Sequence, residues 1–137
     1  MKAVLDPNVL ISAMLAPGGA PARALRAWLN GSHELVVSPL LLAEVERALG
    51  YPKLRARVSA QEAAELLELL RDHGELVADP TASFAIRSPD AGDDYLIALA
   101  AASGALLVSG DGHLLTLAGQ LPVFSPAAFL AKLGEDS

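Results

Sequence analysis

The 137-residue chain contains no cysteine, which excludes a disulfide framework, a thiolate metal site and a cysteine nucleophile. Charged residues are scarce at 19% and no long polar tract occurs, so global disorder is excluded as well. No secretory signal is evident, because residues 6–8 interrupt the first apolar run. The apolar run over residues 96–108 is too short to span a membrane. We therefore expect a cytoplasmic protein without membrane contact.

Apolar residues are abundant at 53%, and the mean hydropathy is +0.40, so the chain can bury a sizeable core. Its length favours a single domain over residues 1–137. The net charge of -6 argues against nucleic-acid binding by bulk electrostatics. One stretch without acids is basic, however, and is a candidate contact for RNA or a protein partner, or else a solvated face. It contains Arg47, Lys53, Arg55 and Arg57.

Short apolar segments alternate with helical patterns along the chain. Strands are predicted over residues 2–5, 34–37, 75–78, 105–109 and 122–124. Helices are predicted over residues 8–15, 20–30, 38–49, 59–73, 90–103, 114–117 and 125–133, with a loop over 79–89. Strands that are apolar throughout are typical of a parallel sheet buried on both faces. The pattern predicts an α/β fold, a three-layer α/β/α sandwich with a short, mainly parallel sheet. Ligands of such folds bind beyond the carboxyl ends of the strands.

Four acidic residues lie where this fold offers apolar surroundings or strand ends. Asp6 and Asp111 follow predicted strands, Glu44 lies on an apolar helical stripe, and Asp94 lies near the start of an alanine-rich helix. Buried carboxylates are costly unless paired or bound to metal. Two of them about 5 Å apart repel by roughly 3 kcal/mol at an effective dielectric near 20. We expect no Lys or Arg beside these acids, so a divalent cation would have to compensate their charge.

The chemistry of these side chains favours a hard cation. Carboxylate oxygens suit Mg²⁺ or Mn²⁺, whereas zinc is disfavoured because cysteine is absent and the three histidines are scattered. Such a cation can lower the pKa of a bound water and stabilise the leaving oxygen in phosphodiester hydrolysis. The acids therefore indicate a metal-dependent nuclease.

Four segments of the sequence resemble the PIN-domain family. They are VLDPNVLISAML, SPLLLAEVERAL, DDYLIALAAASGALLVSGD and the terminal SPAAFLAKL, which occur in the family's order over nearly the whole chain. The resemblance implies a PIN-like fold and Mg²⁺- or Mn²⁺-dependent cleavage of RNA. It also implies the toxin role of a toxin–antitoxin pair, an antitoxin partner and a homodimer.

The resemblance also implies roles for individual residues. It assigns catalytic and metal-binding roles to Asp6, Glu44, Asp94 and Asp111, with Asp93 as the competing ligand beside Asp94, and supporting roles to Asn8 and Ser109. One position departs from the family, since Pro7 stands where a small hydroxyl residue is usual. Proline lacks a backbone donor, so the hydrogen bonding around Asp6 is expected to differ from the family's.

Plainer interpretations remain open for the same acids. Asp6 and Asp111 could form turns, Glu44 could be an exposed helix acid, and Asp94, like Asp90 and Asp93, could complement a helix dipole.

The other chemically versatile side chains are given structural roles. We expect Trp28 in the core and His33, His73 and His113 on the surface near the ends of elements. A minor role near phosphate stays open for His113.

Two other functions compete with the nuclease. The first is a catalytically silent PIN-like module that binds an antitoxin or a ribonucleoprotein, which Pro7 and the acidic charge favour. The second is aspartyl-phosphate chemistry, which also uses a strand-end Asp. The DPN segment lacks the second Asp of an acid/base pair, and no lysine follows the late strand before Lys132 in the terminal helix. These absences disfavour the second alternative.

Overall fold

The computed structural model describes residues 1–80 and 94–136. In this part of the chain five parallel strands form one sheet with the order β3-β2-β1-β4-β5. The strands are β1 (Lys2–Leu5), β2 (Glu34–Val37), β3 (Glu75–Leu76), β4 (Leu106–Val108) and β5 (Val123–Phe124). The predicted parallel sheet is confirmed, although its third strand is shorter than predicted.

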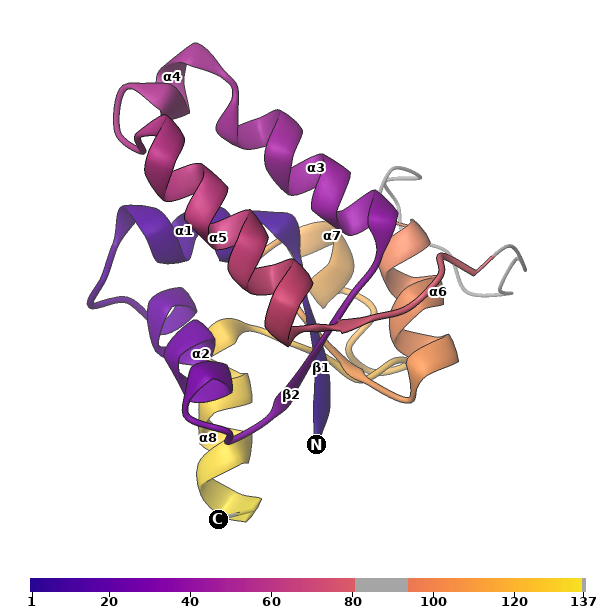
Figure 1. Ribbon diagram of the computed structural model, residues 1–137. Helices are drawn as coiled ribbons and strands as arrows, with labels where there is room; N and C mark the ends of the chain where they lie inside the picture. The colour runs from indigo at the N-terminus through magenta and orange to yellow at the C-terminus, as the bar shows by residue number, and fades with distance from the viewer. Residues whose placement is uncertain (81–93, 137) are drawn as a thin grey trace.

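Helices cover the sheet on both faces (Figure 1). They are α1 (Pro7–Leu15), α2 (Ala20–Leu29), α3 (Pro39–Leu49), α4 (Pro52–Arg55), α5 (Ala60–His73), α6 (Asp94–Ser103), α7 (Gly112–Leu115) and α8 (Pro126–Asp136). Helix α6 packs against β1 and β4, whereas α3 runs beside α5 and α2 contacts both α1 and α8. This arrangement confirms the predicted three-layer α/β/α architecture. The short helix α4 was not predicted.

The register between β1 and β4 determines which polar residues meet at the carboxyl end of the sheet. Strand β1 pairs with β4 so that Leu5 lies opposite Val108, and both side chains are fully buried. The residues that follow, Asp6 and Ser109, therefore emerge side by side at the carboxyl end of the sheet. This is also where the strand order reverses direction, since the chain builds β2 and β3 on one side of β1 and then β4 and β5 on the other. Ligand sites of open parallel sheets lie at such a point.

Local signals in the sequence fix several helix ends. The Ser38 hydroxyl accepts a hydrogen bond from the third residue of α3, as predicted for a serine cap. Ser59 and Glu62 form the predicted capping box at the start of α5, and the backbone N–H of Ser59 keeps the pKa of the Glu62 carboxyl below its usual value. Gly31 and Gly104 follow α2 and α6 with φ of 84° and 64°, a conformation that favours glycine.

The expectation that His33 lies on the surface is wrong. Only 4% of this residue is exposed, because α2 and α8 both cover it. Its Nε2 lies 3.0 Å from the carbonyl oxygen of Ala24, and its ring meets Phe129 edge-on with 4.9 Å between centroids. His73 is exposed as predicted, and Trp28 is buried as predicted. The side chain of His113 lies outside the described residues.

No described helix combines the length and the apolar character that a membrane crossing requires.

Candidate functional site

Asp6 is held by hydrogen bonds through its backbone and through both carboxylate oxygens. It follows β1 directly, only 3% of it is exposed, and its backbone N–H donates to the Val108 carbonyl at 2.9 Å. Its Oδ1 accepts the backbone N–H of Asn8 at 2.9 Å, and its Oδ2 accepts the hydroxyl of Ser109 at 2.8 Å. Both carboxylate oxygens are thus fixed at the carboxyl end of the sheet, in the part of the fold where ligands bind.

Pro7 fits this local geometry. It occupies the first position of α1, while Asp6 is the cap residue whose side chain accepts from Asn8. The backbone N–H of a first helical residue has no partner within the helix, so proline loses nothing there. The departure from the family pattern therefore leaves the Asp6 carboxylate with two donors, supplied by Asn8 and Ser109.

Ser109 links Asp6 to Asp111. The Ser109 side chain is fully buried, donates to Asp6 and accepts the backbone N–H of Asp111 at 3.0 Å. One hydroxyl therefore sets the position of both strand-end acids. The supporting role of Ser109 at the site stays a prediction.

The surroundings of Asp6 favour its protonated form. Burial raises the pKa of the Asp6 carboxyl, the hydrogen bonds from Asn8 and Ser109 lower it in part, and the negative charge of Asp111 raises it again. The net pKa is above the usual value of 3.8. A positive charge at this point would remove the cost of the ionised form, so the site is chemically suited to a cation.

A cavity of about 230 Å³ lies beside Asp6 and is called the acid cavity below. Asp6 and Glu44 both line it, together with Asn8, Arg47, Tyr51 and Tyr95. The structure therefore brings the first two predicted acids to one cavity, although they lie on different elements.

Glu44 is paired with a basic residue, contrary to expectation. Its carboxylate accepts a hydrogen bond from the Arg47 guanidinium, which raises the pKa of Arg47. The expectation of acids without a neighbouring Lys or Arg is therefore wrong for Glu44. Residues three apart on a helix are neighbours, so the spacing within α3 was the signal that identifies this pair.

The third predicted acid, Asp94, begins α6 and is half-buried. The next residues, Tyr95 and Leu96, line the acid cavity, whereas Asp94 itself is not among its lining residues. The competing ligand Asp93, and Asp90, lie outside the described residues. The start of α6 thus borders the cavity that Asp6 and Glu44 share.

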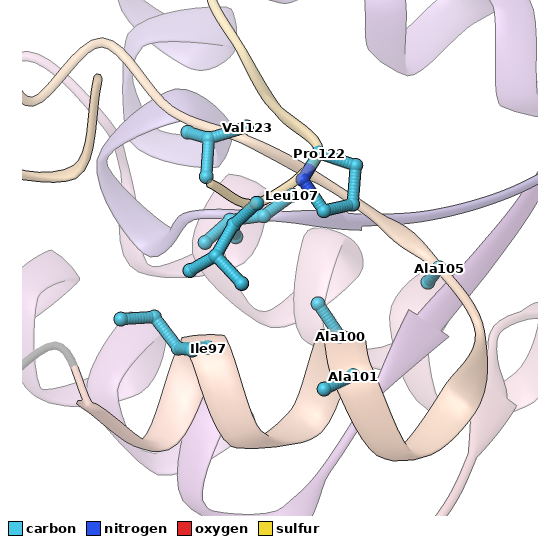
Figure 2. Close-up of a pocket in the computed structure, with 8 residues that line it drawn as sticks. Ile97, Ala100, Ala101, Ala105, Leu107, Pro122 and Val123 are labelled. Atoms are coloured by element: carbon cyan, nitrogen blue, oxygen red, sulfur yellow. The ribbon is translucent and has the colours of Figure 1, made fainter. Parts of the chain in front are cut away.

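A second cavity of about 280 Å³ adjoins the first at Asn8. Ser12, Pro21, Asp111 and Pro126 are among its lining residues. Asp6 and Asp111, which Ser109 connects, therefore line neighbouring cavities. A third cavity, of about 30 Å³, contains none of the acids, because apolar residues of α6, β4 and β5 and of the segments just before the two strands line it (Figure 2).

The acids can be tested against the needs of a metal ion. Within residues 1–80 and 94–136, no three acidic or histidine side chains are grouped closely enough to hold one. Mg²⁺ commonly binds one or two carboxylates and keeps several waters. The oxygen-only donors Asp6 and Asp111, which are close enough for the charge of one to raise the pKa of the other, fit that requirement.

The basic stretch divides into two parts. Lys53 and Arg55 belong to α4 and Arg57 follows it, and all three are exposed. Arg47 lies on α3, where it lines the acid cavity and contacts Glu44. Arg47 is therefore the member of the stretch that the structure brings to the acids.

Comparison with known proteins identifies the class. A family model described as PIN domain matches residues 2–113, so the chain belongs to the PIN-domain family. Members of this family are generally nucleases and usually use divalent metal ions. The chain is also 29% identical over 119 residues to the uncharacterized protein MJ1680 of Methanocaldococcus jannaschii, covering 85% of this chain and 75% of that protein.

Solved structures share the fold. PAE2754 from Pyrobaculum aerophilum matches with a TM-score of 0.67 and 19% identity, over 98% of this chain and 90% of that one. VapBC2 from Rickettsia felis, bound to a DNA fragment from its promoter, matches with a TM-score of 0.61 and 14% identity, over 91% and 98% of the two chains. FitAcB from Neisseria gonorrhoeae matches with a TM-score of 0.56 and 22% identity, also over 91% and 98%. These likenesses confirm the predicted PIN-like fold.

Proposed function

We propose that this PIN domain is a Mg²⁺- or Mn²⁺-dependent endoribonuclease that hydrolyses RNA phosphodiester bonds as the toxin of a toxin–antitoxin pair. One observation carries the proposal. Asp6 is a buried carboxylate at the carboxyl end of the sheet, both of its oxygens accept hydrogen bonds, and the negative charge of Asp111 lies near it. Besides capping α1, a buried and oriented carboxylate beside a second acid is suited to hold a cation, because a cation offsets the cost of burying its charge.

The proposed roles are those that the resemblance to the PIN-domain family implies. Asp6 and Asp111 would bind the cation, and Glu44 and Asp94, with Asp93 as the alternative to Asp94, would be the further acids of the site, although no three acids of the described residues are grouped closely enough to hold a cation in this structure. When bound, the cation would supply Lewis-acid activation of water and charge stabilisation of the leaving oxygen. Ser109 and the backbone of Asn8 orient the Asp6 carboxylate through the hydrogen bonds described above.

Cleavage of RNA in the presence of Mn²⁺ tests the proposal. Asp6→Asn and Asp94→Asn, made separately, are expected to reduce cleavage strongly, since each removes a charge but preserves side-chain size. Asp72→Asn is the matched control, because Asp72 is an exposed acid in the last turn of α5. Undiminished cleavage by both site variants rejects the nuclease.

The partners belong to the same proposal. Likeness of fold to VapBC2 and FitAcB supports a toxin–antitoxin setting, so we propose an antitoxin protein as partner, a homodimeric toxin and action on RNA in the cytoplasm. Co-purification with the product of an adjacent small open reading frame tests the antitoxin. Light scattering of the purified chain tests the dimer, which a monomeric mass would exclude.

A catalytically silent binding module is the second candidate. The Glu44–Arg47 ion pair favours it, because Glu44 already has a cationic partner in the structure. Thermal unfolding with increasing Mn²⁺ separates the two candidates, since a ligand that binds only the native state raises the midpoint. No shift at millimolar Mn²⁺ favours the silent module, and a shift that Asp6→Asn abolishes favours the nuclease.

A further inference from the structure

Arg47 is the one cationic side chain among the described residues that line the acid cavity. Its side chain is 59% exposed although it also bonds to Glu44 and to the hydroxyl of Tyr51. A guanidinium carries five N–H donors in a planar fork that matches the oxygens of a phosphate. The two contacts fix the guanidinium at the cavity wall and leave donors for a phosphate that enters the cavity.

Tyr51 presents an aromatic surface next to this cation. The residue is 47% exposed, lines the acid cavity and lies just beyond the end of α3. The Arg47 guanidinium carbon is 5.8 Å from the centroid of its ring, and the Tyr51 hydroxyl accepts a hydrogen bond from the same guanidinium. Glu44, Arg47 and Tyr51 thus form a connected row in which the acid positions the base and the base positions the ring.

We propose that Arg47 and Tyr51 form a subsite for one nucleotide of single-stranded RNA, with the phosphate on Arg47 and the base stacked on Tyr51. The proposal rests on the nuclease function proposed above and names the form of its substrate. A base can stack on a side chain only when it is not paired and stacked within a duplex. The subsite therefore selects single strands, and it places the backbone of the bound strand at the cavity that Asp6 and Glu44 line.

The charge of the chain explains why such a local subsite is needed. A net charge of -6 repels RNA at long range, and the acids of the cavity place part of that negative charge at the site itself. Stacking depends much less on ionic strength than phosphate contacts do. The exposed Lys53 and Arg55 on α4 would add phosphate contacts of the salt-dependent kind, whereas Tyr51 would supply affinity that persists at higher salt.

Binding of a short, fluorescently labelled single-stranded RNA, followed by anisotropy in EDTA, tests the subsite without interference from cleavage. Tyr51→Ala is expected to weaken binding by about 5- to 150-fold, the range for losing one stacked base. Tyr51→Phe keeps the ring and is expected to retain most of the affinity. Arg47→Ala is expected to weaken binding, whereas Arg71→Ala, which removes the same charge from an exposed position on α5 that pairs with Glu46, is expected to leave it unchanged.

Several outcomes overturn the proposal. They are unchanged binding by Tyr51→Ala, an equal loss in Arg71→Ala and Arg47→Ala, equal affinity for a duplex of the same length, and no binding of the single strand by the unaltered chain. Thermal unfolding of each variant shows whether it is folded. The two proposals can fail separately. If Tyr51→Ala loses RNA binding while Asp6→Asn still cleaves RNA at the unaltered rate, the subsite is supported and the proposed nuclease mechanism is rejected.

Discussion

The hydroxyl of Ser109 donates a 2.8 Å hydrogen bond to Asp6 across 103 positions of the chain. The bond joins residues that directly follow the two central strands, and Ser109 is fully buried. Because the same hydroxyl accepts the Asp111 N–H, it is a shared support for two of the four predicted acids. Removal of this hydroxyl should therefore lower the stability of the fold and alter the positions of Asp6 and Asp111.

Ser109→Ala is expected to lower the free energy of unfolding at pH 7 by about 1–3 kcal/mol, the cost of leaving a buried polar group without its partner. Urea denaturation measures the change. Ser32→Ala, at an exposed position before β2, is the control and is expected to change stability by less than about 0.5 kcal/mol. Equal effects of the two substitutions would contradict a supporting role for Ser109.

The raised pKa of Asp6 predicts a pH-dependent effect of Asp6→Asn. A carboxyl whose folded pKa exceeds the unfolded value of 3.8 favours the folded state below 3.8 and loses that contribution as pH rises through the folded pKa. Asparagine also caps helices and carries no charge. In EDTA, the variant is therefore expected to become more stable relative to the unaltered chain as pH rises from 3 to 7. Urea denaturation across this range measures the difference, and a change of the opposite sign contradicts the assigned shift.

The buried position of His33 predicts unequal effects for two histidines. His33→Ala removes the contact with the Ala24 carbonyl and the packing against Phe129, and is expected to cost about 1–3 kcal/mol of unfolding free energy. His73→Ala, at an exposed position, is expected to change it by less than about 0.5 kcal/mol. Comparable losses in the two variants, measured by urea denaturation, would contradict a core role for His33.

Local patterns were sufficient for much of the fold and for part of the site. The apolar strand before Asp6 and the serine caps at Ser38 and Ser59 depend on neighbours in sequence, and the structure confirms them. His33 was misassigned because its cover comes from Phe129, far along the chain. The bond from Ser109 to Asp6 depends on strand register, for which the sequence offered no distance.

Arg47 is a different case, because its pairing with Glu44 was recoverable from helical spacing alone. Residues 44, 47 and 51 recur on one side of the helical pattern. Composition alone groups Arg47 with the basic residues that follow it and says nothing of its position beside Glu44. The contacts of a charged side chain in a helix depend on the helix face that it occupies more than on the residues next to it in sequence.

The Glu44–Arg47 pair predicts opposite effects of one substitution on metal and on RNA. Arg47→Met removes a cation that repels Mn²⁺ and occupies the Glu44 carboxylate. The variant is therefore expected to bind Mn²⁺ about two- to five-fold more tightly, in line with the modest strength of exposed ion pairs, while binding single-stranded RNA more weakly. Titration calorimetry with Mn²⁺ and anisotropy with RNA measure the two quantities on the same preparation. Mn²⁺ binding by Arg47→Met that is no tighter than that of the unaltered chain would show that Glu44 does not contribute to the cation site, since its release from Arg47 would then have brought no gain.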